Sequence, residues 1–108
     1  MKNLKQLIIS NNVNLHCDAI QNLTNLIYLN ISSNNIINSS IDNLINLTYL
    51  DVSYCLNIDS NAFRNLKNIM YLNHIGCKNI SIDIEKNPCI KKICCWKNWN
   101  INYLYINN

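Results

Sequence analysis

The residues that could bind a metal ion or attack a substrate are few, and most of them are cysteines. The 108-residue chain holds six cysteines and two histidines, with Cys89, Cys94 and Cys95 close together and His16 beside Cys17. Structural zinc sites are usually built from paired cysteine knuckles, whereas adjacent residues such as Cys94 and Cys95 point to opposite faces of a strand. We therefore expect no metal site and no cofactor, and we interpret the cysteines as reduced structural thiols.

The sequence also lacks the combinations of residues that enzymes use. A nucleophilic enzyme needs a base beside its nucleophile, and a metal enzyme needs His and carboxylate ligands at facing positions. Glu85 is the single glutamate and Gly76 the single glycine, so there is no glycine-rich phosphate loop. We predict that the protein is not an enzyme.

Three regularly spaced tyrosines are the best candidates for binding another molecule. They stand at positions 28, 49 and 71, which are almost evenly spaced. Tyrosine suits protein recognition because it combines a large apolar ring with a hydrogen-bonding tip at low entropic cost. The alternative is that the rings only pair across strands and stabilise a sheet. The predicted partner-binding residues are the tyrosines and the polar residue two places after each one: Tyr28, Asn30, Tyr49, Asp51, Tyr71 and Asn73.

These positions belong to a repeat of the type Leu-x-x-Leu-x-Leu-x-x-Asn, which occurs five times. Successive copies start near residues 4, 26, 47, 69 and 90, at spacings of 22, 21, 22 and 21. Such a period predicts stacked units, because one unit cannot bury its apolar face alone. The apolar fourth and sixth places alternate with polar ones, which predicts one short strand in each unit and parallel stacking of the strands.

The remainder of each unit must turn the chain and bring it back. The ninth place marks the turn, where an Asn amide satisfies backbone groups and the small thiols of Cys55 and Cys77 act as substitutes. A return of this length has little room for a full helix, so we expect irregular or 3₁₀ turns, with a short helical turn around residues 60–66. The predicted core residues of the return segments are Leu15, Ile37, Ile58 and Ile80, then Ile20, Ile41, Phe63 and Ile84, then Leu23, Leu44 and Leu66.

Two residues depart from the repeat. Asn87 stands where the next Leu is due, which predicts that the final unit packs differently. His74 stands in the apolar column of Ile31 and Val52. We expect His74 to be a packed, neutral core residue with one satisfied nitrogen; the alternative is a bulge that puts Ile75 in the core and turns His74 outward.

The repeat as a whole resembles the leucine-rich repeat family, over residues 4 to about 101. The resemblance implies an α/β solenoid shaped as a horseshoe arc, with short parallel strands on a concave face that binds a protein partner. We expect one domain over residues 1–108, in which residues 99–108 form a C-terminal tail or cap.

Two finer resemblances concern the role and the source of the chain. The corner cysteines are similar to those of the cysteine-type repeats found behind F-box domains. This implies, as an alternative function, the substrate-recognition subunit of a ubiquitin-ligase assembly. The Asn- and Ile-rich style, 43 of 108 residues, is similar to that of the leucine-rich repeat genes of insect poxviruses.

Basic and aromatic residues gather in the last unit and give a weaker alternative. Basic groups between aromatic rings bind nucleic acid by phosphate contact and base stacking. The net charge is only +3, and an end unit also needs aromatic cover, so we expect capping rather than nucleic-acid binding. The residues concerned are Lys86, Lys91, Lys92, Trp96, Lys97 and Trp99.

The apolar runs of the sequence are short. None is long enough for a signal-peptide core or a membrane span, so we expect an intracellular, cytoplasmic protein that does not enter a membrane. Met1 lies shortly before Leu4, the first core position, which predicts an opening unit without a cap. Self-association through that unit is therefore a further partner hypothesis.

Overall fold

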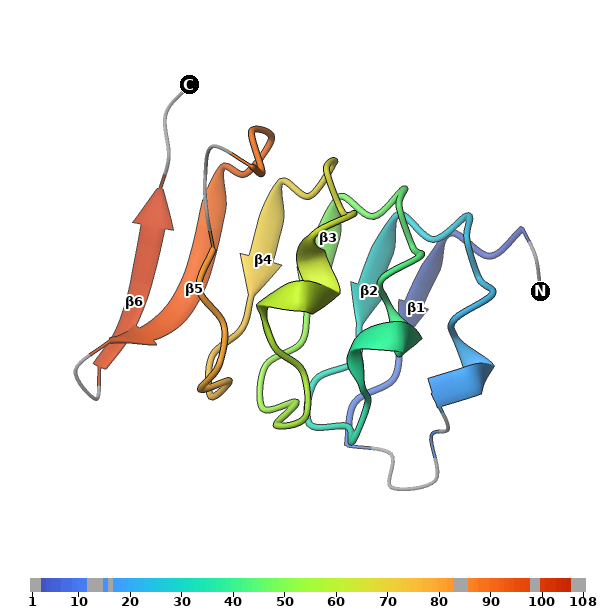
Figure 1. Cartoon of the computed structure of the whole chain (residues 1–108), viewed down its shortest axis with the longest axis horizontal. Coiled ribbons are helices and arrows are strands. Elements are labelled where there is room, and N and C mark those ends of the chain that lie inside the picture. Colours follow the sequence, from blue (N-terminus) through green and yellow to red (C-terminus); the bar gives the residue numbers. More distant parts are fainter. Residues whose placement is uncertain (1–2, 12–14, 16, 83–85, 98–99, 106–108) are drawn as a thin grey trace.

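Short strands stacked side by side form the frame of the protein. The computed structural model describes residues 3–11, 15, 17–82, 86–97 and 100–105, with the backbone alone at residues 17, 96–97 and 100–105. Strands and 3₁₀ helices alternate over most of the chain, as Figure 1 shows. The elements are β1 (Gln6–Ile8), η1 (Cys17–Ala19), β2 (Tyr28–Asn30), η2 (Asn38–Ser40), β3 (Tyr49–Asp51), η3 (Ser60–Phe63), β4 (Tyr71–Asn73), β5 (Lys92–Lys97) and β6 (Asn100–Tyr105).

The strands form one sheet in chain order. β1 to β5 are parallel, and β6 pairs antiparallel with β5. The steps between aligned positions equal the spacings of the sequence repeat, so the predicted strands and their register are confirmed. A parallel sheet with few helices is compatible with the α/β class. The residues aligned at the first place of the strands are Gln6, Tyr28, Tyr49, Tyr71 and Lys92.

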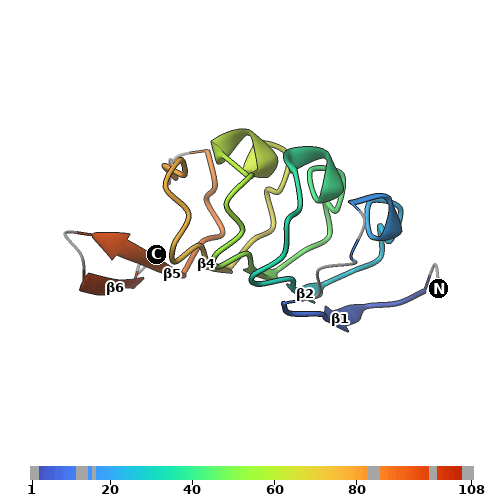
Figure 2. The same ribbon diagram turned by 90° about the horizontal axis from the view of Figure 1, so that it is seen from below.

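The segments that connect consecutive parallel strands run back along one side of the sheet. Figure 2 shows η1, η2 and η3 on the same side. Each is a 3₁₀ helix of a single turn, and η3 accounts for the helical turn expected around residues 60–66. The expectation of 3₁₀ turns is therefore confirmed, because a connection of this length leaves no room for a longer helix.

The core lies between the sheet and the return segments. Burial of its apolar side chains removes them from water, which is the main favourable term in folding. Leu29 and Leu50, at the centres of β2 and β3, are fully buried, and Leu72 in β4 is 3 % exposed. From the return side, the predicted residues Ile20, Ile41, Ile58, Phe63, Leu23, Leu44 and Leu66 are all buried.

One predicted core residue is wrong. Ile37 is 46 % exposed, and its neighbour Ile36 is fully buried in its place. The unit that starts at position 26 is shorter by one position than the unit that starts at position 47. Its apolar residue therefore enters the core two places after the corner residue Asn34 rather than three.

The other predicted core positions have mixed outcomes. Leu15 and Ile80 are only partly buried, and Ile84 lies outside the described residues. Asn87 is 8 % exposed, although it is polar. The Ile90 amide donates to the Asn87 carbonyl at 3.3 Å, as the Leu47 amide does to Leu44 at 3.1 Å. The backbone turn before Ile90 is thus kept, but the described part of this return segment forms no 3₁₀ helix, unlike the three return segments before it.

His74 is packed in the core, as the first hypothesis expects. It is 8 % exposed and Ile75 is 9 % exposed, so the outward-turned alternative is wrong. The satisfied nitrogen is not found at Nδ1, which is buried and has no hydrogen-bond partner among the described residues. Burial lowers the pKa of His74 below its ordinary value, which favours the neutral ring.

β2, β3 and β4 are each followed by a tight corner that closes with an Asn or a Cys. The Asn34 side-chain nitrogen donates to the carbonyl oxygens of Ile9 at 2.7 Å, Ile31 at 3.0 Å and Ser32 at 3.1 Å. The Cys55 thiol donates to the Ile31 oxygen at 3.1 Å, and the Cys77 thiol donates to the Val52 oxygen at 3.2 Å. The predicted exchange of thiol for amide is confirmed at these corners; the equivalent Asn12 and Asn98 lie outside the described residues.

The residue before each of the first four corner positions adopts a left-handed backbone, which the spacing of the repeat does not predict. Asn11, Ser33, Tyr54 and Gly76 have φ of 51°, 58°, 58° and 80°. They recur at the same intervals as the strands. The left-handed conformation is therefore part of the repeat, although only the Asn and the Gly are typical of it.

The C-terminal segment is more regular than the predicted tail. β5 is six residues long, twice the length of the other parallel strands, and Asn100–Tyr105 pair along all of it. The expected cap over residues 99–108 is thus an antiparallel strand, β6, over the part that the structure describes. Residue 99 and residues 106–108 lie outside that part.

A tyrosine-lined face of the sheet

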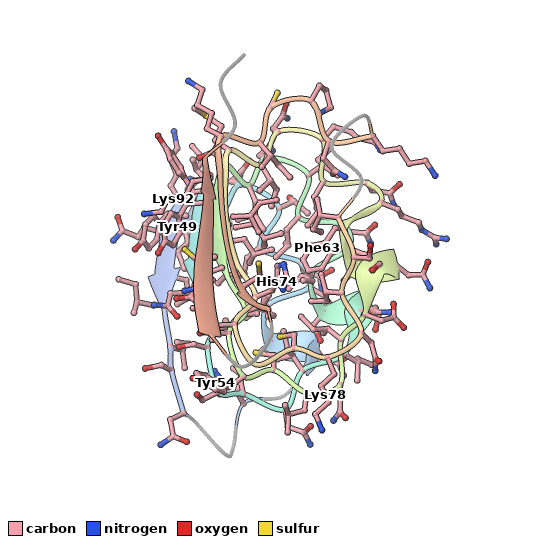
Figure 3. All side chains as sticks on the ribbon, turned by 90° about the vertical axis from the view of Figure 1, so that its left-hand side faces the viewer. Tyr49, Tyr54, Phe63, His74, Lys78 and Lys92 are labelled. Atoms are coloured by element: carbon pink, nitrogen blue, oxygen red, sulfur yellow. The ribbon has the colours of Figure 1, made fainter. Side chains whose placement is uncertain are left out.

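The face of the sheet turned away from the return segments gathers all six predicted partner-binding residues. Side chains alternate between the two faces of a strand, so the first and third residues of each strand project away from the core. Figure 3 shows Tyr49 and Lys92 on this side and His74 and Phe63 on the other. We call it the strand face; its residues in β2 to β5 are Tyr28, Asn30, Tyr49, Asp51, Tyr71, Asn73, Lys92 and Cys94.

The three tyrosines are neighbours across the sheet but are not equivalent. The rings of Tyr28 and Tyr49 are stacked, with centroids 4.1 Å apart and planes 5° from parallel. Both side chains are half-buried, whereas Tyr71 is 41 % exposed. Stacking favours the stabilising role for the first pair, and exposure leaves Tyr71 as the ring most accessible to a partner.

Tyr49 keeps its hydroxyl proton over the whole physiological range. Burial raises its pKa to about 12, and the neighbouring Tyr28 hydroxyl and Asp51 carboxylate add to the rise. The group therefore acts as a neutral donor and acceptor, not as a base.

The side chains of Asn30, Asp51 and Asn73 accept hydrogen bonds from their own backbone segments. Asn30 Oδ1, Asp51 Oδ1 and Asn73 Oδ1 each accept the amide proton of the residue two places on, at 3.1, 2.9 and 3.1 Å. Asp51 Oδ1 also accepts the Ser53 hydroxyl at 2.7 Å, and Asp51 is only 9 % exposed. This local bonding is how Asn and Asp support turns, so only the other polar atom of each side chain is available to a partner.

A shallow groove of about 170 Å³ opens on the strand face beyond the stacked pair. Its walls include the Tyr49 and Tyr71 rings and the side chains of Lys92 and Cys94. Of these four residues, only the two tyrosines belong to the predicted partner-binding set, which includes neither Lys92 nor Cys94. The strand register could have identified Cys94, because Cys94 aligns with Asn73 of the preceding unit.

The basic residues of the last unit do not form one cluster. Lys92 lines the groove on the strand face, while Lys91 lines a separate cavity with Met70 and Pro88. Lys86 lines a third cavity beside η3. The three described lysines therefore line three different cavities; the side chains of Trp96 and Lys97 and all of Trp99 lie outside the described residues, so the nucleic-acid alternative stays a prediction.

Three of the described thiols have a raised pKa. The cysteines at positions 55, 77, 89, 94 and 95 are free. Burial raises the pKa of Cys55 to about 11 and also raises the pKa of Cys77 and Cys94, which keeps these groups protonated and weakly nucleophilic. Within the described residues, no three His, Cys, Asp or Glu side chains come together as metal ligands.

The comparisons with known proteins leave the function to be argued from this geometry. None of the helices formed by the described residues has the length and apolar character that a membrane crossing needs. No protein-family model matches the chain, and a search of the curated proteins also finds no match.

Proposed function

We propose that the chain is a leucine-rich-repeat solenoid that binds a protein partner on its strand face without catalysing a reaction. The observation that carries the proposal is the aligned column of Tyr28, Tyr49 and Tyr71 on a face that the return segments do not cover. Aromatic side chains in the centre of a surface commonly supply most of the binding free energy of an interface. The equality of strand register and sequence period supports the repeat assignment.

We assign different roles in binding to the three tyrosines. Tyr71 and the groove beside it are the anchor point, since this ring is the most exposed of the three. The Tyr28 and Tyr49 stack forms a rigid platform next to it. A partner that inserts a side chain between Tyr49 and Tyr71 gains burial of both rings at little cost in side-chain entropy.

Affinity capture from cell extract followed by mass spectrometry tests the proposal. The variants are Tyr71→Ala, the triple change of Tyr28, Tyr49 and Tyr71 to Ala, and Tyr54→Ala as a control. Tyr54 is 49 % exposed but lies away from the strand face, at the corner side (Figure 3). A true partner is retained by the wild type and by the control and is lost by the triple variant.

Binding of the identified partner is then measured with purified proteins. Tyr71→Ala alone should weaken it by about tenfold or more, as expected for a hot-spot aromatic. A partner that binds the triple variant as tightly as the wild type, while that variant keeps its thermal unfolding transition, would contradict the proposal. A ubiquitin-ligase adaptor among the captured proteins would instead support the substrate-recognition alternative, which rests on the corner thiols.

Self-association is a second candidate because of one exposed side chain. Ile8 lies on β1 in register with Asn30, and it is 56 % exposed. Burial of such an apolar side chain against a second copy is favourable by about 1.5–3 kcal/mol. Sedimentation at increasing concentration should show a dimer that Ile8→Ser abolishes; a monomer at all concentrations ends this candidate.

A further inference from the structure

The return side carries a cavity that the proposed function does not use. It lies between η3 and the return segment that follows β4, which run side by side in Figure 1 and Figure 2. Its volume is about 220 Å³, well above what one water molecule needs. The lining residues that matter below are Ser60, Phe63, Arg64, Lys67, Ser81 and Lys86.

Positive charge is concentrated around this cavity. Arg64, Lys67 and Lys86 supply three of the nine Lys and Arg residues of the chain. Of the described residues that line the cavity, none is a carboxylate. The three side chains are exposed, so water and salt screen their mutual repulsion, and an anion bound among them is attracted by each.

The walls of the cavity are tied together by hydrogen bonds. The Ser81 amide donates to Ser60 Oγ at 2.7 Å, and the Ser60 hydroxyl donates to the Ser81 carbonyl oxygen at 3.1 Å. Across the cavity, Lys67 Nζ donates to the Lys86 carbonyl oxygen at 3.1 Å. These bonds join adjoining units of the repeat, so the two walls of the cavity and the Lys67 ammonium group are positioned before any ligand binds.

The floor and the donors suit a compact oxyanion. Phe63 is 3 % exposed and closes the cavity toward the core. The Arg64 guanidinium presents parallel N–H groups that match two oxygens of one anion, and the lysines add point charges. A phosphate dianion matches this set better than a carboxylate, because it carries more charge and more acceptor oxygens.

From this geometry we infer that the Arg64, Lys67 and Lys86 cavity is a phosphate-binding site, for free phosphate or for a phosphomonoester on a larger molecule. The site lies on the opposite side of the sheet from the strand face, so it does not rest on the proposed function. Asp83 and Glu85 lie outside the described residues, so their effect on phosphate binding is measured below with the variant D83N/E85Q.

Titration with inorganic phosphate and with O-phosphoserine tests the site, against chloride at matched ionic strength. Isothermal calorimetry gives the affinity, and amide chemical shifts locate the ligand. We expect a dissociation constant on the order of 1 mM, since exposed ion pairs are individually weak. The shifts should be largest at Ser60, Arg64 and Ser81.

Matched charge variants separate a site from general attraction. R64Q/K67Q/K86Q should bind phosphate at least tenfold more weakly, while K5Q/K78Q/K91Q removes the same charge from lysines elsewhere and should bind as the wild type does. D83N/E85Q should bind as tightly or more tightly. Equal affinity for both anions points to free phosphate, and tighter phosphoserine binding points to a phosphorylated partner.

Several results would overturn the site. The first two are the absence of phosphate-dependent shifts in the wild type and shifts confined to the strand face. The others are an equal loss of affinity in R64Q/K67Q/K86Q and K5Q/K78Q/K91Q, and weaker binding by D83N/E85Q. Each variant is first checked for an unchanged thermal unfolding transition, so that a loss of binding is not a loss of fold.

Discussion

The corners at residues 31–34 and 74–77 occupy the same place in the repeat but differ at each of their three working positions. The first corner has the fully buried Ile31 in the core, whereas the second has His74 with an unpartnered Nδ1 among the described residues. The first ends on an amide that makes three hydrogen bonds. The second ends on the Cys77 thiol, whose bonds to the Val52 and Cys55 oxygens measure 3.2 and 3.4 Å.

At these two positions the first corner has the stronger residues, whereas at the left-handed position the second corner does. The corner at residues 74–77 has Gly76, which adopts a φ of 80° without a steric penalty, whereas the corner at residues 31–34 has Ser33 at 58°. Each corner therefore combines strong and weak residues in a different way. The two corners indicate that a corner is stabilised jointly by a packed residue, a permissive backbone and a side-chain donor, so that a weaker residue at one position is tolerated.

Removing the amide donor of the first corner should have the largest effect. Asn34→Ala eliminates three hydrogen bonds from a residue that is 4 % exposed, so we expect a loss of about 3 kcal/mol in the free energy of unfolding. Urea unfolding measures it. Asn34→Cys, which copies the Cys55 and Cys77 corners, should recover about half of this loss, because a thiol is a weaker donor than an amide. No difference between the Ala and Cys variants would contradict the role of the thiol as a substitute donor.

The second-largest effect is expected from adding a methyl group at the left-handed position of the second corner, residues 74–77. A Cβ at Gly76 would stand 2.5 Å from Tyr54 Cδ1, and its backbone is disfavoured for an L residue. We expect Gly76→Ala to cost about 2 kcal/mol. In a Tyr54→Ala background the ring overlap is absent, so the cost should fall to about 1 kcal/mol. An unchanged cost there would show that the ring does not contribute.

The buried histidine should make stability depend on pH in a window that the first corner lacks. The folded-state pKa of His74 lies below the unfolded value of about 6.5, so the unfolded chain binds the proton more readily. Stability is then full above that value and falls as the pH drops below it. The free energy of unfolding should therefore fall between pH 7 and 5.5 in the wild type and in His16→Gln, but not in His74→Leu. Equal pH profiles for wild type and His74→Leu would contradict this account.

The parts of the fold that depend on spacing could be predicted from the sequence. Alternating apolar residues at a fixed period determine which positions align, so the column of Tyr28, Tyr49 and Tyr71 and the burial of Leu29 and Leu50 followed directly. The substitution of Cys55 for Asn at a corner also followed, because a thiol retains a donor and tolerates burial.

The parts that depend on local geometry could not be predicted. The exchange of Ile36 for Ile37 arises from where the shorter unit omits its residue, and spacing alone does not locate it. In the sequence, Asp51 looks like a member of an exposed polar column, and nothing there shows that its Oδ1 accepts a hydrogen bond from the Ser53 amide of its own turn. Tyr54 gives no sign of a left-handed backbone, since its side chain disfavours one. Only the alignment of Asn11 with Gly76 could have suggested that the whole column shares it.

The smallest effect tests whether the strain at Ser33 is real. Ser33 is exposed and has a φ of 58°, so Ser33→Gly removes a steric penalty of about 1–2 kcal/mol and adds a backbone entropy cost of about 0.5–1 kcal/mol. The net expectation is a stabilisation of about 0.5 kcal/mol. Ser39 is also exposed but lies in η2, without a positive φ, so Ser39→Gly carries the entropy cost alone and should destabilise by a similar amount. Opposite signs for two identical substitutions, measured by urea unfolding, would separate backbone strain from loss of the serine side chain; a shared sign would mean that the first corner holds Ser33 without cost.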